Sequence, residues 1–160
     1  MKGLYKVVLL TGLLAGTLDI ISAILLAYLT SGRVPYKIFH YISSGILGKE
    51  KAYAGGFEMV ILGLFLHFLI AYIFTVFYFW IYPKVGFLSI NKVVSAILYG
   101  AFMWVVMNKV VLPLSRVPQG KFDWTQAIIG MTVLIVMLGI PIAFNAHKYY
   151  KSDEAITTLR

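Results

Sequence analysis

Four long apolar stretches dominate the pattern of hydrophobic and polar positions along the chain. Each is long enough to cross the hydrocarbon core of a bilayer, which takes about 20 residues of helix. Continuous apolar runs do not alternate as the wall of a transmembrane barrel does, so they predict helices. The predicted spans are residues 5–29, 54–82, 93–114 and 124–146. We therefore predict an all-α fold: an integral membrane four-helix transmembrane bundle that forms one domain over residues 1–160.

Aromatic residues mark the ends of these spans. Trp80 and Tyr82 close the second span, and Trp124 opens the fourth. Such rings sit at the level of the lipid headgroups in membrane proteins. The first apolar run continues to Leu29, well beyond the apolar core of about 7–15 residues in a secretory signal. We interpret it as a retained transmembrane helix.

A short amphipathic helix is predicted between the first two spans, over residues 35–47. Ile38, Ile42 and Ile46 recur at every fourth position, and Pro35 suits the first position of a helix. An amphipathic helix between two spans is typical of the membrane interface. The alternative is an ordered polar loop. Beyond the last span, residues 148–160 form a polar tail with no core of its own.

Composition supports a membrane protein. Hydrophobic residues make up 61% of the chain and charged residues only 12%, against about 45–50% apolar and 25% charged in a soluble domain. The net charge is +8. Because the basic residues lie beside the apolar runs, we expect them to contact anionic lipid headgroups and not nucleic acid. The chain has no cysteine, which excludes disulfides and thiolate chemistry.

The distribution of basic residues bears on orientation. Four spans place both termini on one side of the membrane. Seven Lys and Arg lie on that side and six on the other, so the positive-inside rule does not decide the orientation. We expect cytoplasmic termini. The first group is Lys2, Lys6, Lys84, Lys92, Lys148, Lys151 and Arg160, and the second is Arg33, Lys37, Lys49, Lys51, Arg116 and Lys121.

Two titratable side chains lie near the middle of predicted spans. Asp19 shares a helix face with Gly12 and Gly16, and His67 shares a face with Gly63. Small residues let another helix approach closely, so both faces should point into the bundle. An ionisable group in the bilayer costs about 2.5–3.5 kcal/mol on insertion scales, so its presence needs a reason.

Each of these two residues has a structural and a functional interpretation. Asp19 is either a hydrogen-bonded packing residue or a group that handles protons or cations. His67 is either a buried histidine that bonds a neighbour or the partner of Asp19. An imidazole beside a carboxylate titrates near neutral pH. The pair is the sharpest chemical hypothesis that the sequence offers.

Further polar residues in the spans add candidates. Asn108 shares a face with Gly100, where it is expected to hydrogen-bond across helices and to join Asp19 in an intramembrane polar cluster. Lys109 either extends its ammonium group toward the membrane surface or forms an ion pair with Asp19 or Glu58. Gly100 is a further expected site of close helix packing.

No sequence motif predicts an enzyme. The chain lacks the zinc-protease, nucleophile-elbow, P-loop and dinucleotide-binding patterns. The three histidines are His40, His67 and His147, and no two have metal-ligand spacing on one helix. We therefore predict no catalytic residues, no metal site and no cofactor. A lipid-modifying reaction at Asp19 and His67 is left open as a minor alternative.

Six short motifs occur in a fixed order along the chain. They are Gly16-Thr17-Leu18-Asp19, Ser44-Gly45-Ile46-Leu47-Gly48, Gly55-Gly56, residues 62–68 (LGLFLHF), Tyr99-Gly100 and residues 107–115 (MNKVVLPLS). Together they resemble a group of uncharacterised small bacterial integral membrane proteins and, distantly, the YagU-like inner-membrane family. The resemblance implies a bacterial inner membrane and singles out Asp19, His67 and Asn108. It implies no reaction.

Two functions from different classes remain. The first is a structural or accessory helical-bundle module that binds lipid or a protein partner, or assembles as a homo-oligomer; small-residue faces and basic loops support it. The alternative is a small transporter or channel for protons, ions or a solute, which uses the inward-facing Asp19 and His67. The presence or absence of a polar cavity at these residues discriminates between them.

Overall fold

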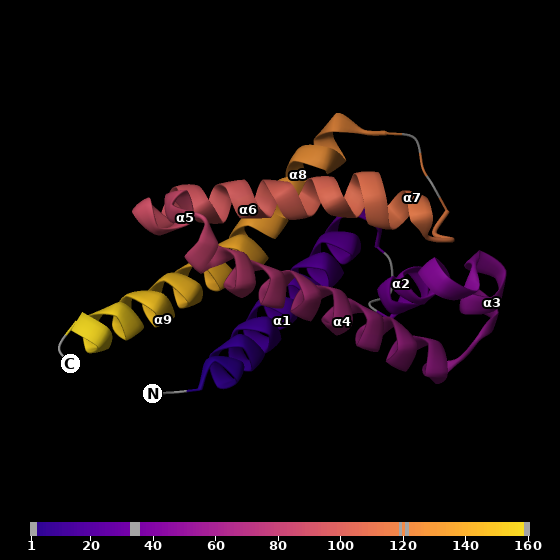
Figure 1. The fold of residues 1–160 in the computed structure, drawn as a ribbon. Helices are drawn as coiled ribbons and strands as arrows, with labels where there is room; N and C mark the ends of the chain where they lie inside the picture. The colour runs from indigo at the N-terminus through magenta and orange to yellow at the C-terminus, as the bar shows by residue number, and fades with distance from the viewer. Residues whose placement is uncertain (1–2, 33–35, 119, 121, 159–160) are drawn as a thin grey trace.

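The computed structural model describes residues 3–32, 36–118, 120 and 122–158, and every regular element among them is a helix (Figure 1). The predicted all-α fold is therefore confirmed. In chain order the elements are α1 (Leu4–Ser31), α2 (Lys37–Leu47), α3 (Lys49–Ala54), α4 (Phe57–Ile81), the 3₁₀-helix η1 (Tyr82–Lys84), α5 (Gly86–Ile90), α6 (Lys92–Val106), the π-helix η2 (Met107–Val111), α7 (Leu112–Leu114), α8 (Trp124–Leu134), the π-helix η3 (Ile135–Gly139) and α9 (Ile140–Thr158).

Four helical stretches are long and apolar enough to cross a membrane. They are Leu4–Thr30, Phe57–Lys84, Lys92–Leu114 and Trp124–Ser152, close to the four predicted spans. The last one differs from the prediction, because α9 runs on to Thr158 and makes part of the polar tail helical. No glycine or proline occurs between residues 146 and 158, so nothing in the sequence stops the helix there.

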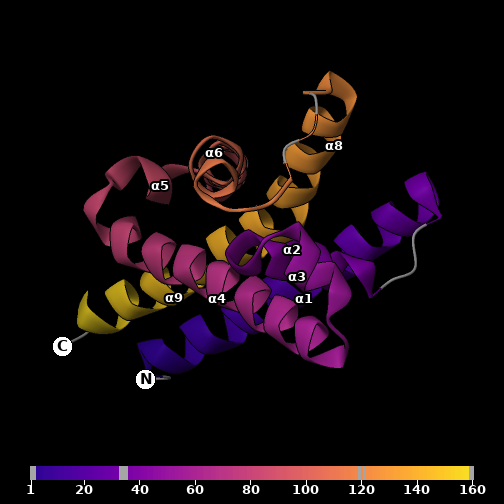
Figure 2. The same ribbon diagram turned by 90° about the vertical axis from the view of Figure 1, so that its right-hand side faces the viewer.

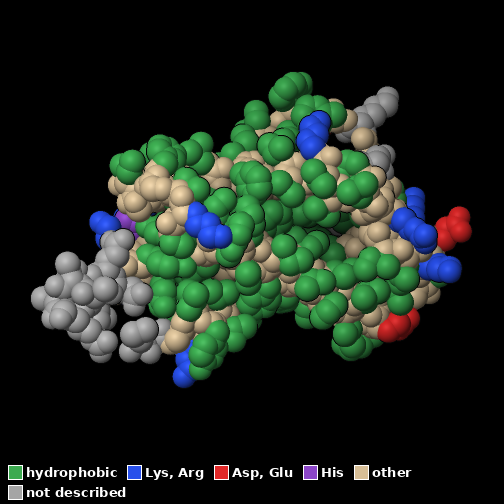
Figure 3. Space-filling model, in the orientation of Figure 1, with side chains coloured by type: hydrophobic (Ala, Val, Ile, Leu, Met, Phe, Trp, Pro, Cys, Tyr) green, Lys and Arg blue, Asp and Glu red, His purple; other side chains and the backbone are tan. Residues whose placement is uncertain are grey.

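The two termini lie at the same end of the molecule, as four crossings require (Figures 1 and 2). The turn formed by η1 and α5 also lies toward that end, whereas α2, α3 and α7 lie toward the other in Figure 1. In the space-filling view, apolar side chains cover the middle of the visible face, and Lys, Arg and acidic side chains gather mostly near its two ends (Figure 3). This distribution is typical of a protein surrounded by lipid.

The short helix between the first two spans is present as α2, and Pro35 lies outside the described residues. Its buried face is the polar one: His40, Ser43 and Ser44 are buried, whereas Ile46 is exposed. The face packs on α4 at Gly63, where an added methyl group would collide with the backbone of Phe39. The helix wheel alone favours the isoleucine face. The Ser43 and Ser44 hydroxyls can be buried because they donate to carbonyls of α2 itself, at 3.1 and 2.6 Å.

The carbonyl of Gly45 also accepts a hydrogen bond of 2.9 Å from the Arg116 amide. This bond ties α2 to the segment after α7. Together with the contact on α4, it makes α2 part of the bundle rather than a separate surface element.

Close packing holds the other spans together. The backbone of η3 lies against Gly100 of α6, and Gly139 lies against the carbonyl of Ala96, so a side chain at either glycine would collide with backbone. Tyr78, Met103 and Ile142 are fully buried between α4, α6 and α9. Lipid is as apolar as these side chains, so close van der Waals contact and interhelical hydrogen bonds stabilise the bundle.

The start of α6 is defined by a side-chain cap. Asn91 lies before the helix, and its Oδ1 accepts hydrogen bonds from the amides of Val93 and Val94, at 2.9 and 3.2 Å. These bonds satisfy amides that have no carbonyl partner in the first turn of a helix. The cap fixes where the third span begins.

Candidate functional site

The contact between α1 and α4 positions the two titratable side chains. Gly12 lies against the ring of Tyr72, and a methyl group at Gly16 would come within 2.9 Å of the Phe68 ring. Because these two glycines have no side chain, α4 can pack closely against α1 at these positions. The approach brings Asp19, less than one turn after Gly16, next to His67.

His67 is held by a hydrogen bond across the helix interface. Its Nε2 donates to the carbonyl oxygen of Gly16 at 2.8 Å, because a carbonyl can only accept. The other ring nitrogen, Nδ1, lies 4.0 Å from Oδ2 of Asp19. The side chains of His67 and Asp19 are 11% and 18% exposed. The hydrogen bond therefore orients the imidazole so that Nδ1 faces the carboxyl group.

This geometry limits the protonation states of the pair. In a neutral imidazole that donates from Nε2, Nδ1 carries a lone pair and is an acceptor. An ionised carboxylate is also only an acceptor. At 4.0 Å the two groups attract each other when the imidazole carries an additional proton and is charged, or when a cation or hydrogen-bond donor lies between them. The geometry therefore leaves room for a proton or a small cation between the two acceptor atoms.

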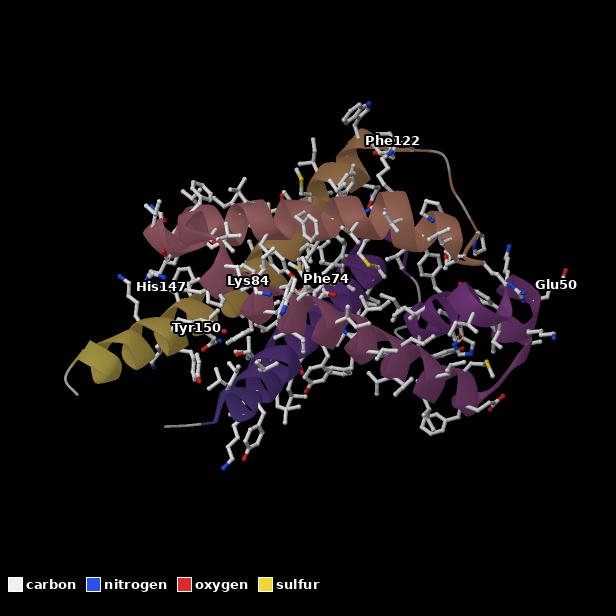
Figure 4. The ribbon with its side chains drawn as sticks, in the orientation of Figure 1. Glu50, Phe74, Lys84, Phe122, His147 and Tyr150 are labelled. Carbon is white, nitrogen blue, oxygen red and sulfur yellow. The ribbon has the colours of Figure 1, made fainter. Side chains whose placement is uncertain are left out.

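A cavity of about 110 Å³ adjoins the pair. Asp19 and His67 are its polar lining residues, and the other eight are apolar. Phe74 contributes from α4 and lies between α4 and α6 in Figure 4. The full lining is Asp19, Ile42, His67, Ile70, Ala71, Phe74, Met103, Met107, Leu134 and Leu138.

Two π-helical turns form part of the cavity wall. Met107 belongs to η2 and Leu138 to η3. π-Helical turns are rare, and they occur often at functional sites. Each turn is followed within two residues by a proline, Pro113 or Pro141, and a local π-adjustment satisfies the backbone groups that a proline leaves free.

The predicted third member of the polar cluster lies apart from the pair. Asn108 is not among the residues that line the cavity, and its Nδ2 donates to the carbonyl of Trp104 on the same helix, at 2.9 Å. The expected hydrogen bond across helices is therefore replaced by one within the helix. The prediction assumed α-helical periodicity, whereas the π-helical turn at Met107 shifts the following side chains around the axis.

Lys109 and Glu58 each have a local partner. The Lys109 ammonium lies 5.8 Å from the centre of the Phe122 ring, toward the segment between the third and fourth spans. Oε1 of Glu58 accepts a hydrogen bond of 2.7 Å from the Gly56 amide at the start of α4. Among the described residues, no ion pair joins Lys109 to Asp19 or to Glu58.

A second hydrogen-bonded cluster was missed by the sequence analysis. Tyr78 shares a hydrogen bond of 2.5 Å with Ser95, and the Tyr99 hydroxyl donates to the Phe74 carbonyl at 2.6 Å. Nearer the termini, Tyr82 bonds Nδ1 of His147 at 2.7 Å. These bonds join α4 to α6 and η1 to α9.

Tyr82 shows why this cluster was missed. It is 4% exposed and packs inward, although its place at the end of a span is typical of a headgroup anchor. The i, i+4 spacing of Tyr78 and Tyr82 was the available signal. His147 and Tyr150 lie together on α9 in Figure 4, and their rings are both within reach of Tyr82.

No group of three or more His, Asp or Glu side chains in the described part of the chain is placed to hold a metal ion. Neither the known protein families, nor the characterised proteins, nor the solved structures contain a match to this chain. The site therefore has to be interpreted from its own geometry.

Proposed function

We propose that the chain is a small transporter or channel that takes a proton, or a small cationic solute, between Asp19 and His67. The observation that carries the proposal is the orientation of the imidazole. Because Nε2 donates to Gly16, Nδ1 and the Asp19 carboxylate face each other as acceptors at 4.0 Å. A bound proton or cation converts this repulsion into an attraction.

The composition of the cavity supports a small and weakly hydrated substrate. Its lining supplies one carboxyl group and one imidazole, and the other eight residues are apolar. A metal ion such as Ca²⁺ takes six to eight oxygen ligands, far more than this lining offers. A proton, or a compact organic ammonium ion with an apolar body, needs only the one charged partner.

The setting of the site supports transport across a membrane. Ionisable groups within transmembrane helices commonly mark ion and proton pathways. The π-helical turns η2 and η3 give the cavity wall two places where a helix can rearrange. We place the protein in a bacterial inner membrane, as the sequence resemblance implies, with both termini on the cytoplasmic side.

Flux into sealed vesicles tests this proposal. The full-length protein is reconstituted with a pH-sensitive dye inside, and proton uptake is followed after pH jumps between about 5 and 8. Uptake of labelled methylammonium is measured in parallel as the cation probe. We expect uptake of at least one probe above that of empty vesicles. Asp19→Asn and His67→Gln should each reduce it about tenfold or more, since each removes one of the two facing groups.

Two controls make the result specific. Asp123→Asn removes a carboxylate from the cap of α8 and keeps the capping oxygen, so its flux should equal that of the parent. Circular dichroism and gel filtration in detergent show whether each variant retains the fold. If neither probe enters faster than into empty vesicles while the parent protein is folded, the transport proposal is wrong.

A second candidate is an accessory helical-bundle module that binds lipid, a membrane-protein partner or another copy of itself. It is favoured by the apolar lining, because eight of the ten residues around the cavity offer no ligand to a hydrated solute. If the chain is such a module, the vesicles should show no flux of either probe. The Asp19→Asn and His67→Gln variants should then bind lipid or the partner as well as the parent protein does. The vesicle experiment therefore separates the two candidates.

A further inference from the structure

An apolar groove lies on the outside of the bundle, between α4 and α6 and beside the η1–α5 turn. Its volume is about 240 Å³, and all of its lining residues are aliphatic or aromatic. It is separate from the cavity at Asp19 and His67, with which it shares no lining residue. The lining consists of Phe77, Ile81, Val85, Leu88, Leu98, Tyr99 and Phe102.

The floor of the groove presents ring faces and no polar group. The Phe102 ring stacks on Phe77 and on Tyr99, with centroids 5.9 and 5.8 Å apart. The Tyr99 hydroxyl points inward, where it donates to the Phe74 carbonyl. Leu98 remains 49% exposed at the rim. An occupant of this groove must therefore be apolar where it contacts the protein.

A cation lies beside the groove. Lys84 of η1 lies between the lining residues Ile81 and Val85 in the sequence. Its Nζ is 3.4 Å from the centre of the Trp80 ring. Trp80 is 58% exposed, and its ring centroid is 6.1 Å from that of Phe77 in the groove. Residues 82–91 contain no acidic side chain, so the positive charge is not neutralised within the turn.

We propose that this groove binds an anionic phospholipid, with an acyl chain along the aromatic floor and the phosphate at Lys84. The occupant follows from the two neighbouring features. Hydrocarbon chains fill apolar grooves on the lipid-facing surface of a membrane protein, and an exposed indole with a lysine above it marks the headgroup level. Basic side chains at that level attract anionic headgroups.

Trp80 serves as the reporter for the test. The chain has three tryptophans, and the double substitution Trp104→Phe with Trp124→Phe leaves only Trp80. This single-tryptophan protein is reconstituted in phosphatidylcholine. Phosphatidylglycerol or phosphatidylcholine with brominated acyl chains is then titrated in, and quenching of Trp80 gives the relative binding constant. The attraction between one lysine near the membrane surface and an anionic headgroup corresponds to about a fivefold preference in binding. We therefore expect phosphatidylglycerol to bind about fivefold more tightly than phosphatidylcholine.

Substitutions assign the preference to the groove. Lys84→Gln should reduce it to about one. Lys6→Gln is the matched control, because Lys6 also lies over an aromatic ring, that of Tyr5, and lies on α1 away from the groove; it should leave the preference intact. About 1 M salt, which shortens the screening length to about 3 Å, should weaken the preference in the parent protein.

Three outcomes would overturn the proposal. Equal quenching by the two brominated lipids means that the groove does not select an anionic headgroup. Lack of quenching by either lipid means that a protein surface, such as a second copy, covers the groove. A preference that survives Lys84→Gln means that the headgroup lies elsewhere. If the single-tryptophan protein does not fold, the same ratio is measured as co-purified phosphatidylglycerol in the parent and in Lys84→Gln.

Discussion

Replacing Asp19 and His67 singly and together measures the interaction energy of the pair. Asp19→Asn removes the negative charge with little change in shape. His67→Gln keeps an N–H group near the position of Nε2, so the hydrogen bond to Gly16 has a replacement donor. The double-mutant cycle then isolates the term between residues 19 and 67 from the cost of each substitution alone.

The expected size follows from the distance. Two unit charges at 4.0 Å interact by about 4 kcal/mol at an effective dielectric constant of about 20. Partial hydration of the cavity lowers this value, so we expect a coupling of about 1–4 kcal/mol that favours the pair at a pH where His67 is an imidazolium beside the Asp19 carboxylate. The assay is reversible unfolding in mixed micelles, titrated with dodecyl sulfate and followed by tryptophan fluorescence.

A coupling below about 0.5 kcal/mol would refute the charged-pair interpretation, because independent sites add to within that amount. A neutral carboxylic acid 4.0 Å from the ring makes no direct hydrogen bond and would give such a result. Folding of each variant is checked by circular dichroism before the cycle is calculated.

Three further substitutions test a close helix contact, a buried hydrogen bond and a helix cap, each against a matched control. Gly63→Ala should cost about 1–3 kcal/mol of unfolding free energy because its methyl group meets backbone; Gly130→Ala, where the methyl group meets only ordinary contacts, should cost nothing. Tyr99→Phe should cost about 1 kcal/mol through its lost buried hydrogen bond, and exposed Tyr5→Phe should be neutral. Asn91→Ala should cost about 1 kcal/mol through loss of the α6 cap, which Asn91→Asp retains. Chemical denaturation in micelles measures all of them, and equal stability within a matched pair would contradict the assigned contact.

The spans were predictable because hydrocarbon imposes a simple constraint. Every backbone polar group in a bilayer must be satisfied within the protein, so a long apolar run becomes a helix. The end of α9 was not predictable from hydropathy, because Lys148 and Lys151 make the tail polar without breaking the helix. The polar inner face of α2 depended on contacts that a helix wheel does not report: Nε2 of His40 bonds the Gly55 carbonyl at 3.4 Å, and the Ser43 and Ser44 hydroxyls bond carbonyls within α2.

The site was predictable only in part. Glycines on the faces of Asp19 and His67 indicated that both residues point inward, and the structure places their side chains 4.0 Å apart. Asn108 was misplaced because a wheel of 3.6 residues per turn does not describe a π-helical turn. The orientation of the imidazole depends on the Gly16 carbonyl, and no sequence pattern reports a contact to the backbone.

Access of water to residue 19 is the most direct test of a central site in the bundle. The chain has no cysteine, so Asp19→Cys and Ile21→Cys give clean single-thiol proteins in vesicles. Ile21 is two residues away and 56% exposed on the lipid-facing surface. A small methanethiosulfonate reagent, which reacts with the thiolate in water, should modify Asp19→Cys at least tenfold faster than Ile21→Cys. Equal inertness of both thiols, or faster reaction at position 21, would contradict a central site open to a proton or a solute.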